Sequence, residues 1–238
     1  MQYQFMPITN GIEAAVSDEH RFTTDSVLLA RFSSPKKNER VAEFCSGCGA
    51  ISLMWFGEGE TPPKSVCGFE IMEEASKLFS LSIEKNNLAE TVFAVCADLR
   101  EYKSIKELPH AGFDLVVCNP PYFEAGFGSG QRQTARQETQ LDIYTVCKAA
   151  AYALKFGGRF CVCFKPQRLP DLFEAMRQSK IEPKTIRQVV PKKGEQPHLV
   201  LVEGKLGAKP QLNWLPELAL YDENGEFAEE YREIYRMR

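Results

Sequence analysis

From residue 40 onward, short apolar runs alternate with longer amphipathic stretches, and this alternation limits the folds open to the chain. The runs are rich in β-branched and aromatic residues and are predicted to be strands; they are RVAEF, SVCGFEI, TVFAVCAD, FDLVVCN and RFCVCF. Residues 72–86 and 139–155 are predicted to be helices, since apolar side chains in the second recur every three or four positions. Strand–helix–strand units cross over with a right hand, so the pattern predicts an α/β fold with a mostly parallel sheet and helices on both faces.

Local signals on either side of this pattern predict further elements. TTDSVLLARF is typical of a helix start, with Thr24 or Asp25 supplying the cap oxygen. Gly157 and Gly158 are predicted to end the second helix just before the next strand. Near the carboxyl end, TIRQVVPKKGEQPHLVLVEGK predicts two strands that form an antiparallel hairpin at the edge of the sheet.

Length and composition favour one globular domain. Hydrophobic residues make up 44% of the chain and charged residues 26%, as in ordinary globular proteins. We expect a single domain over residues 1–238, divided into an N-terminal extension (1–38), a core (39–205) and a C-terminal segment (206–238). No apolar run is long enough to span a bilayer and the start lacks a signal peptide, so we expect a cytoplasmic protein without a membrane partner, most simply a monomer.

Eight cysteines raise the question of metal or redox chemistry. Cys45 and Cys48 form a C-x-x-C, which is compatible with a redox pair, half of a zinc site, or neither. No second C-x-x-C exists, the three histidines are not paired, and we expect Cys161 and Cys163 to lie on opposite faces of a predicted strand. We therefore expect no metal site.

The glycines of the same stretch favour a different use of the C-x-x-C. Gly47 and Gly49 fall between a predicted strand and a predicted helix, where glycines let the backbone approach a bound nucleotide cofactor. A strand–turn–helix also suits a thioredoxin-like dithiol, but that motif does not need the flanking glycines. The cofactor turn is the favoured interpretation, and the cysteine spacing is then accidental.

Three predicted strands end in acidic residues. Glu43 precedes the glycine turn, Glu70 ends the next strand and Asp98 follows the third. A carboxylate at the position of Glu70 can accept hydrogen bonds from two ribose hydroxyls of a nucleoside. The alternative is that Glu70 and Asp98 are helix N-caps, although three such strand ends in series favour a nucleoside site.

The stretch Asn119-Pro120-Pro121-Tyr122 is the most specific signal in the chain. Two prolines force a stiff, extended exit from the fourth strand, so the asparagine amide is held at the ligand-binding edge of the sheet. If the Asn119 side-chain oxygen and the Pro120 carbonyl accept from an aromatic amino group, its nitrogen is drawn towards tetrahedral, while Tyr122 stacks on the ring. This geometry suits methyl transfer to nitrogen without a strong base. A plain proline-rich turn is the alternative.

Taken together, the motifs resemble the class I S-adenosylmethionine-dependent methyltransferases with an N-P-P-Y motif, and within them the bacterial tRNA adenine N6-methyltransferases that modify the adenine beside the anticodon of a valine tRNA. The resemblance runs from about residue 20 to 205, through RFTTDSVLLARF, AEFCSGCGAISL, GFEI, DLVVCNPPYF and RQTARQE. It implies a Rossmann-like fold with a seven-stranded sheet and S-adenosylmethionine as the cofactor. Cys45 departs from the family pattern, which has a glycine at this position.

The resemblance also implies roles for individual residues. The residues implied to bind the cofactor are Glu43, Cys45, Gly47 and Gly49 in the methionine-side loop, Thr24 and Asp25 near the methionine moiety, Glu70 at the ribose, Asp98 and Leu99 at the adenine, and Asn119. Asn119, Pro120 and Tyr122 are implied to be catalytic, with Tyr122 and Phe123 against the target base.

Basic residues are predicted to bind the RNA. The formal net charge of −3 argues against a protein that coats nucleic acid by charge alone, but it permits a local basic face. Arg132 and Arg136 follow the N-P-P-Y motif in a glycine-containing stretch. Lys184, Arg187, Lys192 and Lys193 are four cations with no acidic residue among residues 184–193. We expect them to contact phosphates of an RNA, most simply a tRNA. A solvated loop is the alternative for the arginines.

Other functions remain open from the sequence. N-P-P-Y also occurs in enzymes that methylate a protein glutamine, and N-P-P-F occurs in enzymes that methylate guanine in ribosomal RNA. A third alternative is a non-catalytic protein that binds the cofactor and assists RNA or ribosome assembly, against which the intact Asn119 to Tyr122 motif argues. The sequence favours N6-methylation of an RNA adenine.

Overall fold

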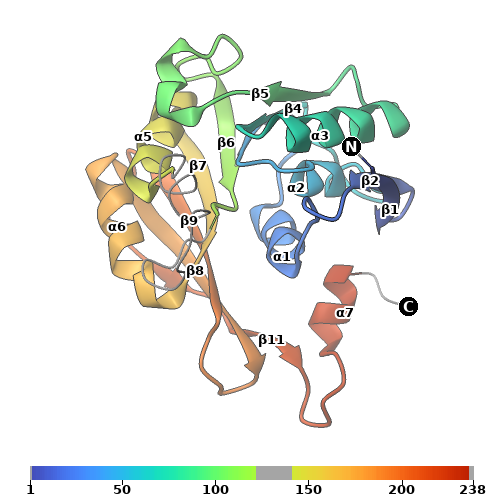
Figure 1. Cartoon of the computed structure of the whole chain (residues 1–238). Coiled ribbons are helices and arrows are strands. Elements are labelled where there is room, and N and C mark those ends of the chain that lie inside the picture. Colours follow the sequence, from blue (N-terminus) through green and yellow to red (C-terminus); the bar gives the residue numbers. More distant parts are fainter. Residues whose placement is uncertain (1, 122–140, 236–238) are drawn as a thin grey trace, which may run out of the picture.

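The computed structural model describes residues 2–121 and 141–235, and its centre is a sheet of nine strands (Figure 1). The strands follow the order β10-β8-β9-β7-β6-β3-β4-β5, and β11 also pairs with β8. The predicted strands are β3 (Arg40–Phe44), β4 (Ser65–Glu70), β5 (Val92–Cys96), β6 (Phe113–Cys118), β7 (Leu154–Phe164), β8 (Ile181–Lys192) and β9 (Leu199–Leu206). Strands β5, β4, β3, β6 and β7 are parallel, whereas β9 is antiparallel to both β7 and β8. The mostly parallel sheet with an antiparallel hairpin is thus confirmed.

Helices cover both faces of this sheet. Alternate strand residues enter two separate cores, so that Val41 packs with one set of helices and its neighbour Ala42 with the other. The first face carries α1 (Thr24–Ser33), α2 (Ala50–Met54) and α3 (Glu73–Lys85). The second carries α5 (Ile143–Ala153) and α6 (Leu169–Gln178). Short 3-10 helices, η1 (Leu99–Ser104) and η2 (Pro166–Arg168), connect strands to these layers. None of the described helices combines the length and apolar character needed to cross a bilayer.

The N-terminal residues contain a hairpin that the sequence pattern did not predict. β1 (Gln4–Thr9) and β2 (Ile12–Val16) are antiparallel and pack against α3. The Ala15 amide donates to the Ser82 hydroxyl at 2.8 Å, and the Glu13 amide donates to the Asn86 side chain at 3.0 Å. The partners of the hairpin are therefore about 70 residues away in sequence, since the two pairs are separated by 67 and 73 positions.

The C-terminal segment returns across the molecule to α1. β10 (Asn213–Trp214) and β11 (Leu218–Tyr221) add to the outer edge of β8, which extends the implied seven strands to nine. Helix α7 (Glu229–Tyr235) then packs against α1 (Figure 1). The Arg31 guanidinium donates to the carbonyl oxygen of Ile234 at 3.2 Å.

Three local predictions were wrong. Thr23 occupies the N-cap position of α1 and makes no side-chain cap hydrogen bond, so neither Thr24 nor Asp25 caps this helix. The prediction that Gly157 and Gly158 end the helix was also wrong, because α5 already ends at Ala153. The two glycines lie inside β7, where the register with β6 shifts, and Gly157 has φ of +79°. They therefore form a bulge in the strand.

The third wrong prediction concerns two cysteines of β7. Cys161 and Cys163 lie in the same core cluster on one face of the sheet. Every second residue of a strand points to the same side, so positions two apart share a face.

Candidate active site at the carboxyl edge of the sheet

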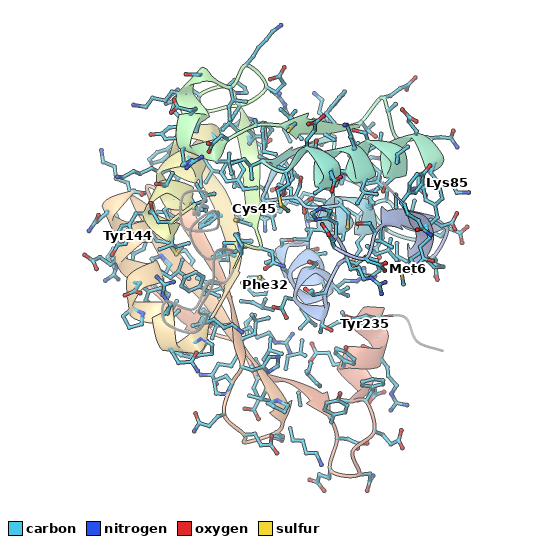
Figure 2. The ribbon with its side chains drawn as sticks, in the orientation of Figure 1. Met6, Phe32, Cys45, Lys85, Tyr144 and Tyr235 are labelled. Atoms are coloured by element: carbon cyan, nitrogen blue, oxygen red, sulfur yellow. The ribbon has the colours of Figure 1, made fainter. Side chains whose placement is uncertain are left out.

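The carboxyl ends of the central parallel strands bring the predicted site residues to one edge of the sheet. β3 pairs with β4 on one side and with β6 on the other, all in parallel register. Phe44 is level with Phe69 and with Cys118, so the segments that follow these residues emerge side by side. Cys45 lies in the middle of the molecule, at the end of β3 (Figure 2). The glycine turn, Glu70 and Asn119 are therefore neighbours, as predicted for a ligand site of an open α/β sheet.

The turn from Cys45 to Gly49 has the backbone of a glycine turn even at its cysteine. Cys45, Gly47 and Gly49 have φ of +55°, +54° and +80°, and the Gly49 amide closes the turn by donating to the Ser46 carbonyl at 2.8 Å. A side-chain carbon on Gly49 would overlap the ring of Phe79, whereas one on Gly47 would meet nothing within 4 Å. Gly49 is thus required for packing against α3, while Gly47 faces open space that a ligand can use.

Glu70 ties this turn to the next strand. Its carboxylate accepts from the Gly47 amide at 2.8 Å through Oε2 and from the Met72 amide at 2.9 Å through Oε1. The side chain is nearly buried, yet Ile71 and Met72 beside it are 42% and 49% exposed. An acidic group next to exposed apolar side chains suits a nucleoside, whose sugar has hydroxyls and whose base has a flat apolar face.

Glu43 supports the turn from beneath. It is buried, and its Oε2 accepts from both the amide and the hydroxyl of Ser52 in α2; the amide contact is 3.0 Å. Burial raises the pKa of Glu43 to about 8, with the Ser52 hydrogen bonds opposing and the Glu70 carboxylate adding to the increase. The sequence placed Glu43 in the cofactor loop, and the structure shows a carboxyl group that holds the start of α2 against the sheet.

The buried carboxyl group of Glu43 should make the stability of the protein depend on pH. Between the ordinary pKa of 4.5 and the raised value of about 8, folded Glu43 keeps a proton that the unfolded chain has lost. The free energy of unfolding should therefore fall as pH rises through this window, by up to about 1.4 kcal/mol per pH unit. Urea unfolding of the wild type and Glu43→Gln between pH 5 and pH 8 measures the effect. The glutamine keeps the shape and cannot titrate, so parallel curves for the two proteins would contradict the prediction.

The C-x-x-C is not a dithiol pair in this structure. All eight cysteines are free. Cys48 is buried, and burial raises its pKa to about 12, which keeps the thiol protonated and unreactive. The Cys45 thiol instead lies within hydrogen-bonding reach of Cys118 on β6, and burial, with this contact, holds the Cys118 pKa well above its usual range. The geometry favours the cofactor-turn interpretation.

Asp98 is a helix N-cap, which was the alternative to a nucleoside contact that the sequence left open. It is the N-cap residue of η1 and accepts from the Arg100 amide at 2.9 Å. Its carboxylate also pairs with the Arg100 guanidinium at 2.8 Å, which holds the pKa of Asp98 below its usual value. Leu99 is buried in the core, so only its backbone is available to a ligand.

Asn119 is held by two side chains from different elements. Its Nδ2 donates to the Ser26 hydroxyl of α1 at 3.2 Å, and its Oδ1 accepts from the Cys163 thiol of β7 at 3.0 Å. Pro120 is buried and Pro121 exposed, as expected where the chain leaves the sheet. Tyr122, Phe123, Arg132 and Arg136 lie outside the described residues.

Charged residues surround the start of α1 next to this asparagine. Burial raises the pKa of Asp25, while the nearby Lys165 and His198 lower it. Burial lowers the pKa of His198, and its Nδ1 has no hydrogen-bond partner in the described part of the chain. The hydroxyl of Tyr235 in α7 lies within hydrogen-bonding reach of Thr24. Ser26, Cys163 and His198 were not predicted to lie at the site, because only the packing of elements distant in sequence brings them here.

The predicted run of four cations is only partly available to a ligand. Arg187 makes two contacts of 2.7 Å with Glu230 and one of 2.9 Å with the Pro216 carbonyl, and its side chain is only 17% exposed. Lys184 donates to the Lys209 carbonyl at 3.1 Å. The expectation was wrong for Arg187, because the C-terminal segment neutralises it. Lys192 and Lys193 lie at the end of β8 and in the loop after it, half-buried and exposed respectively.

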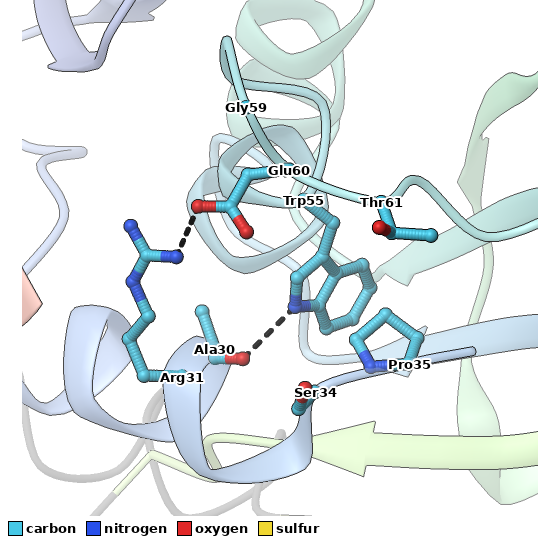
Figure 3. A pocket seen from close by; sticks show the side chains of 8 residues that line it. All are labelled: Ala30, Arg31, Ser34, Pro35, Trp55, Gly59, Glu60 and Thr61. Carbon is cyan, nitrogen blue, oxygen red and sulfur yellow. Dashed lines mark hydrogen bonds and ion pairs between the residues drawn. The ribbon is translucent and has the colours of Figure 1, made fainter. Parts of the chain in front are cut away.

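Two other polar features are formed by residues that were not predicted to belong to the site. A pocket of about 190 Å³ sits at the far end of α1, where Trp55 donates to the Ala30 carbonyl and Arg31 pairs with Glu60 (Figure 3). Among the described residues, Glu19, His20 and Glu74 are the group close enough together to share a metal ion, with ligand atoms within 4.8 Å of one another, and both glutamates are exposed. Neither feature includes a predicted site residue.

Comparison with known proteins gives relatives of similar sequence. A tRNA1(Val) (adenine(37)-N6)-methyltransferase of Bacteroides fragilis is 27% identical over 218 residues, which cover 89% of this chain and 89% of that protein. A protein of the same name from Escherichia coli O157:H7 is 27% identical over 158 residues, which cover 66% of this chain and 62% of that protein.

Solved structures and a family model complete the comparison. A predicted O-methyltransferase from Agrobacterium tumefaciens matches with a TM-score of 0.70 and 20% identity, covering 90% of this chain and 96% of that chain. M. jannaschii TYW2, solved in complex with AdoMet, matches with a TM-score of 0.57 and 14% identity, covering 85% of each chain. These structures support the fold. The model of the methyltransferase small domain matches residues 15–180, well over half of the sequence, and the chain therefore belongs to the methyltransferase small domain family.

Proposed function

We propose that this chain is an S-adenosylmethionine-dependent methyltransferase that modifies N6 of an adenine in tRNA, beside the anticodon. The observation that carries the proposal is the position of Asn119 and its two prolines at the carboxyl end of β6, one strand away from the glycine turn that ends β3. A methyl donor in the turn and an amino group at the asparagine would therefore meet at one point of the sheet edge.

S-adenosylmethionine fits the residues at the ends of β3 and β4. Each oxygen of the Glu70 carboxylate holds one backbone amide and keeps a lone pair for a ribose hydroxyl. The exposed Ile71 and Met72 offer an apolar surface to the adenine ring, and the open side of Gly47 leaves room for the chain of the cofactor. When bound, the cofactor supplies an electrophilic methyl group. The residues proposed to hold it, directly or through their backbone, are Thr24, Asp25, Glu43, Cys45, Gly47, Gly49, Glu70, Asp98, Leu99 and Asn119.

Asn119 and Pro120 are proposed to activate the amino group. A carbonyl oxygen has two lone pairs, so Oδ1 of Asn119 can accept from the substrate while it accepts from Cys163. Together with the Pro120 carbonyl, it would take both N–H groups and draw the nitrogen towards tetrahedral, which frees the nitrogen lone pair. Placement in line with the methyl group then carries most of the rate. Tyr122 is proposed to stack on the base, with Phe123 beside it.

An RNA substrate is supported by the relatives, whose name specifies an adenine of a valine tRNA. Lys192 and Lys193 at the turn between β8 and β9 are proposed phosphate contacts, together with Arg132 and Arg136. An adenine in an unpaired loop costs less to extract than one in a duplex, which favours a tRNA loop as the target. The proposal keeps the cytoplasmic location expected from the sequence.

Nucleoside mass spectrometry of tRNA and ribosomal RNA from cells with and without the gene tests this function. We expect N6-methyladenosine to disappear from tRNA in the deletion strain, and to return with a plasmid that encodes the wild type but not Asn119→Ala. Purified enzyme and a valine tRNA transcript should reproduce the transfer with more than one turnover per chain. Unchanged RNA pools would reject the RNA proposal and direct the same assay to glutamine residues of termination factors.

A further inference from the structure

The proposed chemistry depends on which end of the Asn119 amide faces the substrate. The oxygen accepts hydrogen bonds and the nitrogen donates them, so only the oxygen can bind an amino group through its N–H. The final torsion of an asparagine side chain has a broad energy well, and the backbone therefore does not fix the direction of the amide. Something outside the motif must hold it.

Two contacts fix the plane of this amide. Ser26 Oγ accepts from Nδ2 at 3.2 Å, and the Cys163 thiol donates to Oδ1 at 3.0 Å. Ser26 lies in the first turn of α1 and Cys163 on β7, the strand next to β6. The amide is therefore held between two elements that are distant from it in the sequence, with 93 and 44 residues separating the partners.

The chemistry of Cys163 suits this task. Its side chain is fully buried, so water does not replace the thiol as a donor. Sulfur is a weak acceptor, so an amide nitrogen turned towards it would make a poorer contact than the oxygen does. The second lone pair of the oxygen remains for the substrate.

We propose that Ser26 and Cys163 are positioning residues for Asn119, holding its amide so that one lone pair of Oδ1 stays directed at the amino group of the target adenine. This inference rests on the proposed function, since it assumes methyl transfer to nitrogen at this position. Neither residue touches the reacting atoms; both act through the asparagine. A misdirected amide lowers the rate of the chemical step without weakening the binding of either substrate.

Matched variants on one face of β7 test the role of Cys163. We expect Cys163→Ala to lower kcat about fivefold, the effect of one hydrogen bond of ordinary strength, with KM for cofactor and for RNA unchanged. Cys163→Ser restores an O–H donor and should recover most of the rate. Cys161→Ala removes the same volume from the same buried face two residues away, without a contact to Asn119, and should leave kcat near the wild-type value.

Ser26→Ala should behave as Cys163→Ala does, and Ser26→Thr, which keeps the hydroxyl, should recover activity. Because Ser26 is only half-buried, these variants test the proposal even if Cys163→Ala folds poorly. With an active wild type, equal kcat values for Cys163→Ala and Cys161→Ala, or an unchanged kcat in Ser26→Ala, would overturn it.

A readout independent of turnover separates this inference from the proposed function. In ¹⁵N-labelled protein, the side-chain NH₂ signals of Asn119 are identified by their loss in Asn119→Asp. Cys163→Ala and Ser26→Ala should shift them, and Cys161→Ala should not. If the wild type transfers no methyl group to RNA, the proposed function fails. The NH₂ signals would still show whether Ser26 and Cys163 hold the amide of Asn119. Signals that do not shift in Cys163→Ala and Ser26→Ala would overturn the inference.

Discussion

Asn119→Ala is expected to lower the rate of methyl transfer by on the order of 10²- to 10³-fold, as does the loss of one preorganised hydrogen-bonding group at other reacting centres. Alanine removes the acceptor that draws the amino group towards tetrahedral, and the Pro120 carbonyl alone cannot take both N–H groups. The measurement is the single-turnover rate on a valine tRNA transcript at saturating cofactor, so that any weaker cofactor binding does not enter the result.

Asn119→Asp is the matched control for this variant. Aspartate keeps an acceptor at the same position but loses the amide nitrogen that donates to Ser26. Its rate should fall between those of the wild type and Asn119→Ala. A rate of methyl transfer near that of the wild type in Asn119→Ala would show that this asparagine does not activate the substrate. Equal rates for Asn119→Ala and Asn119→Asp would show that the side-chain oxygen of Asn119 does not contribute to the rate.

Gly49→Ala is expected to lower the free energy of unfolding by about 2–5 kcal/mol. Two effects add: the left-handed backbone at φ of +80° disfavours a side chain by about 1–2 kcal/mol, and the new methyl group would overlap the buried ring of Phe79, which costs about 1–3 kcal/mol. Urea unfolding or calorimetry measures the loss, which corresponds to a melting temperature lower by roughly 10 °C for a chain of this size.

Gly47→Ala separates these two effects. Gly47 also has a positive φ, +54°, but an added carbon there would meet nothing within 4 Å. This variant should therefore lose only the backbone part, about 1 kcal/mol. Equal losses of unfolding free energy in Gly47→Ala and Gly49→Ala would show that overlap with Phe79 does not contribute to the effect of Gly49→Ala.

The parts of the fold that could be predicted are those with local causes. The central strands follow from apolar runs, and the position of the turn at Gly47 and Gly49 follows from two glycines between a strand and a helix. Elements whose partners are distant were missed. The β1–β2 hairpin needs Ser82 of α3, and β11 is a strand of four residues without a periodic signal of its own that pairs with β8.

The candidate site divides in the same way. The Asn119-Pro120-Pro121 stretch and Glu70 were recognised because a short motif or a strand end marks them. Ser26 and Cys163 were not, since the crossing of α1 over the sheet decides what they touch. Arg187 was misjudged for a related reason: a run of like charges indicates a binding surface only when no acidic side chain lies against it, and Glu230 comes from a helix that begins more than 40 positions later.

The path of the C-terminal segment has a consequence for biosynthesis. Helix α7 braces α1, through the contacts of Arg31 with Ile234 and of Tyr235 with Thr24, and α1 carries the serine that holds Asn119. Because a ribosome makes Ile234 only 203 residues after Arg31, α1 leaves the exit tunnel long before its bracing residues exist. A nascent chain, or one that stops before α7, can thus form most of the sheet and still lack the support of its first helix, so the site is finished only once α7 has been made.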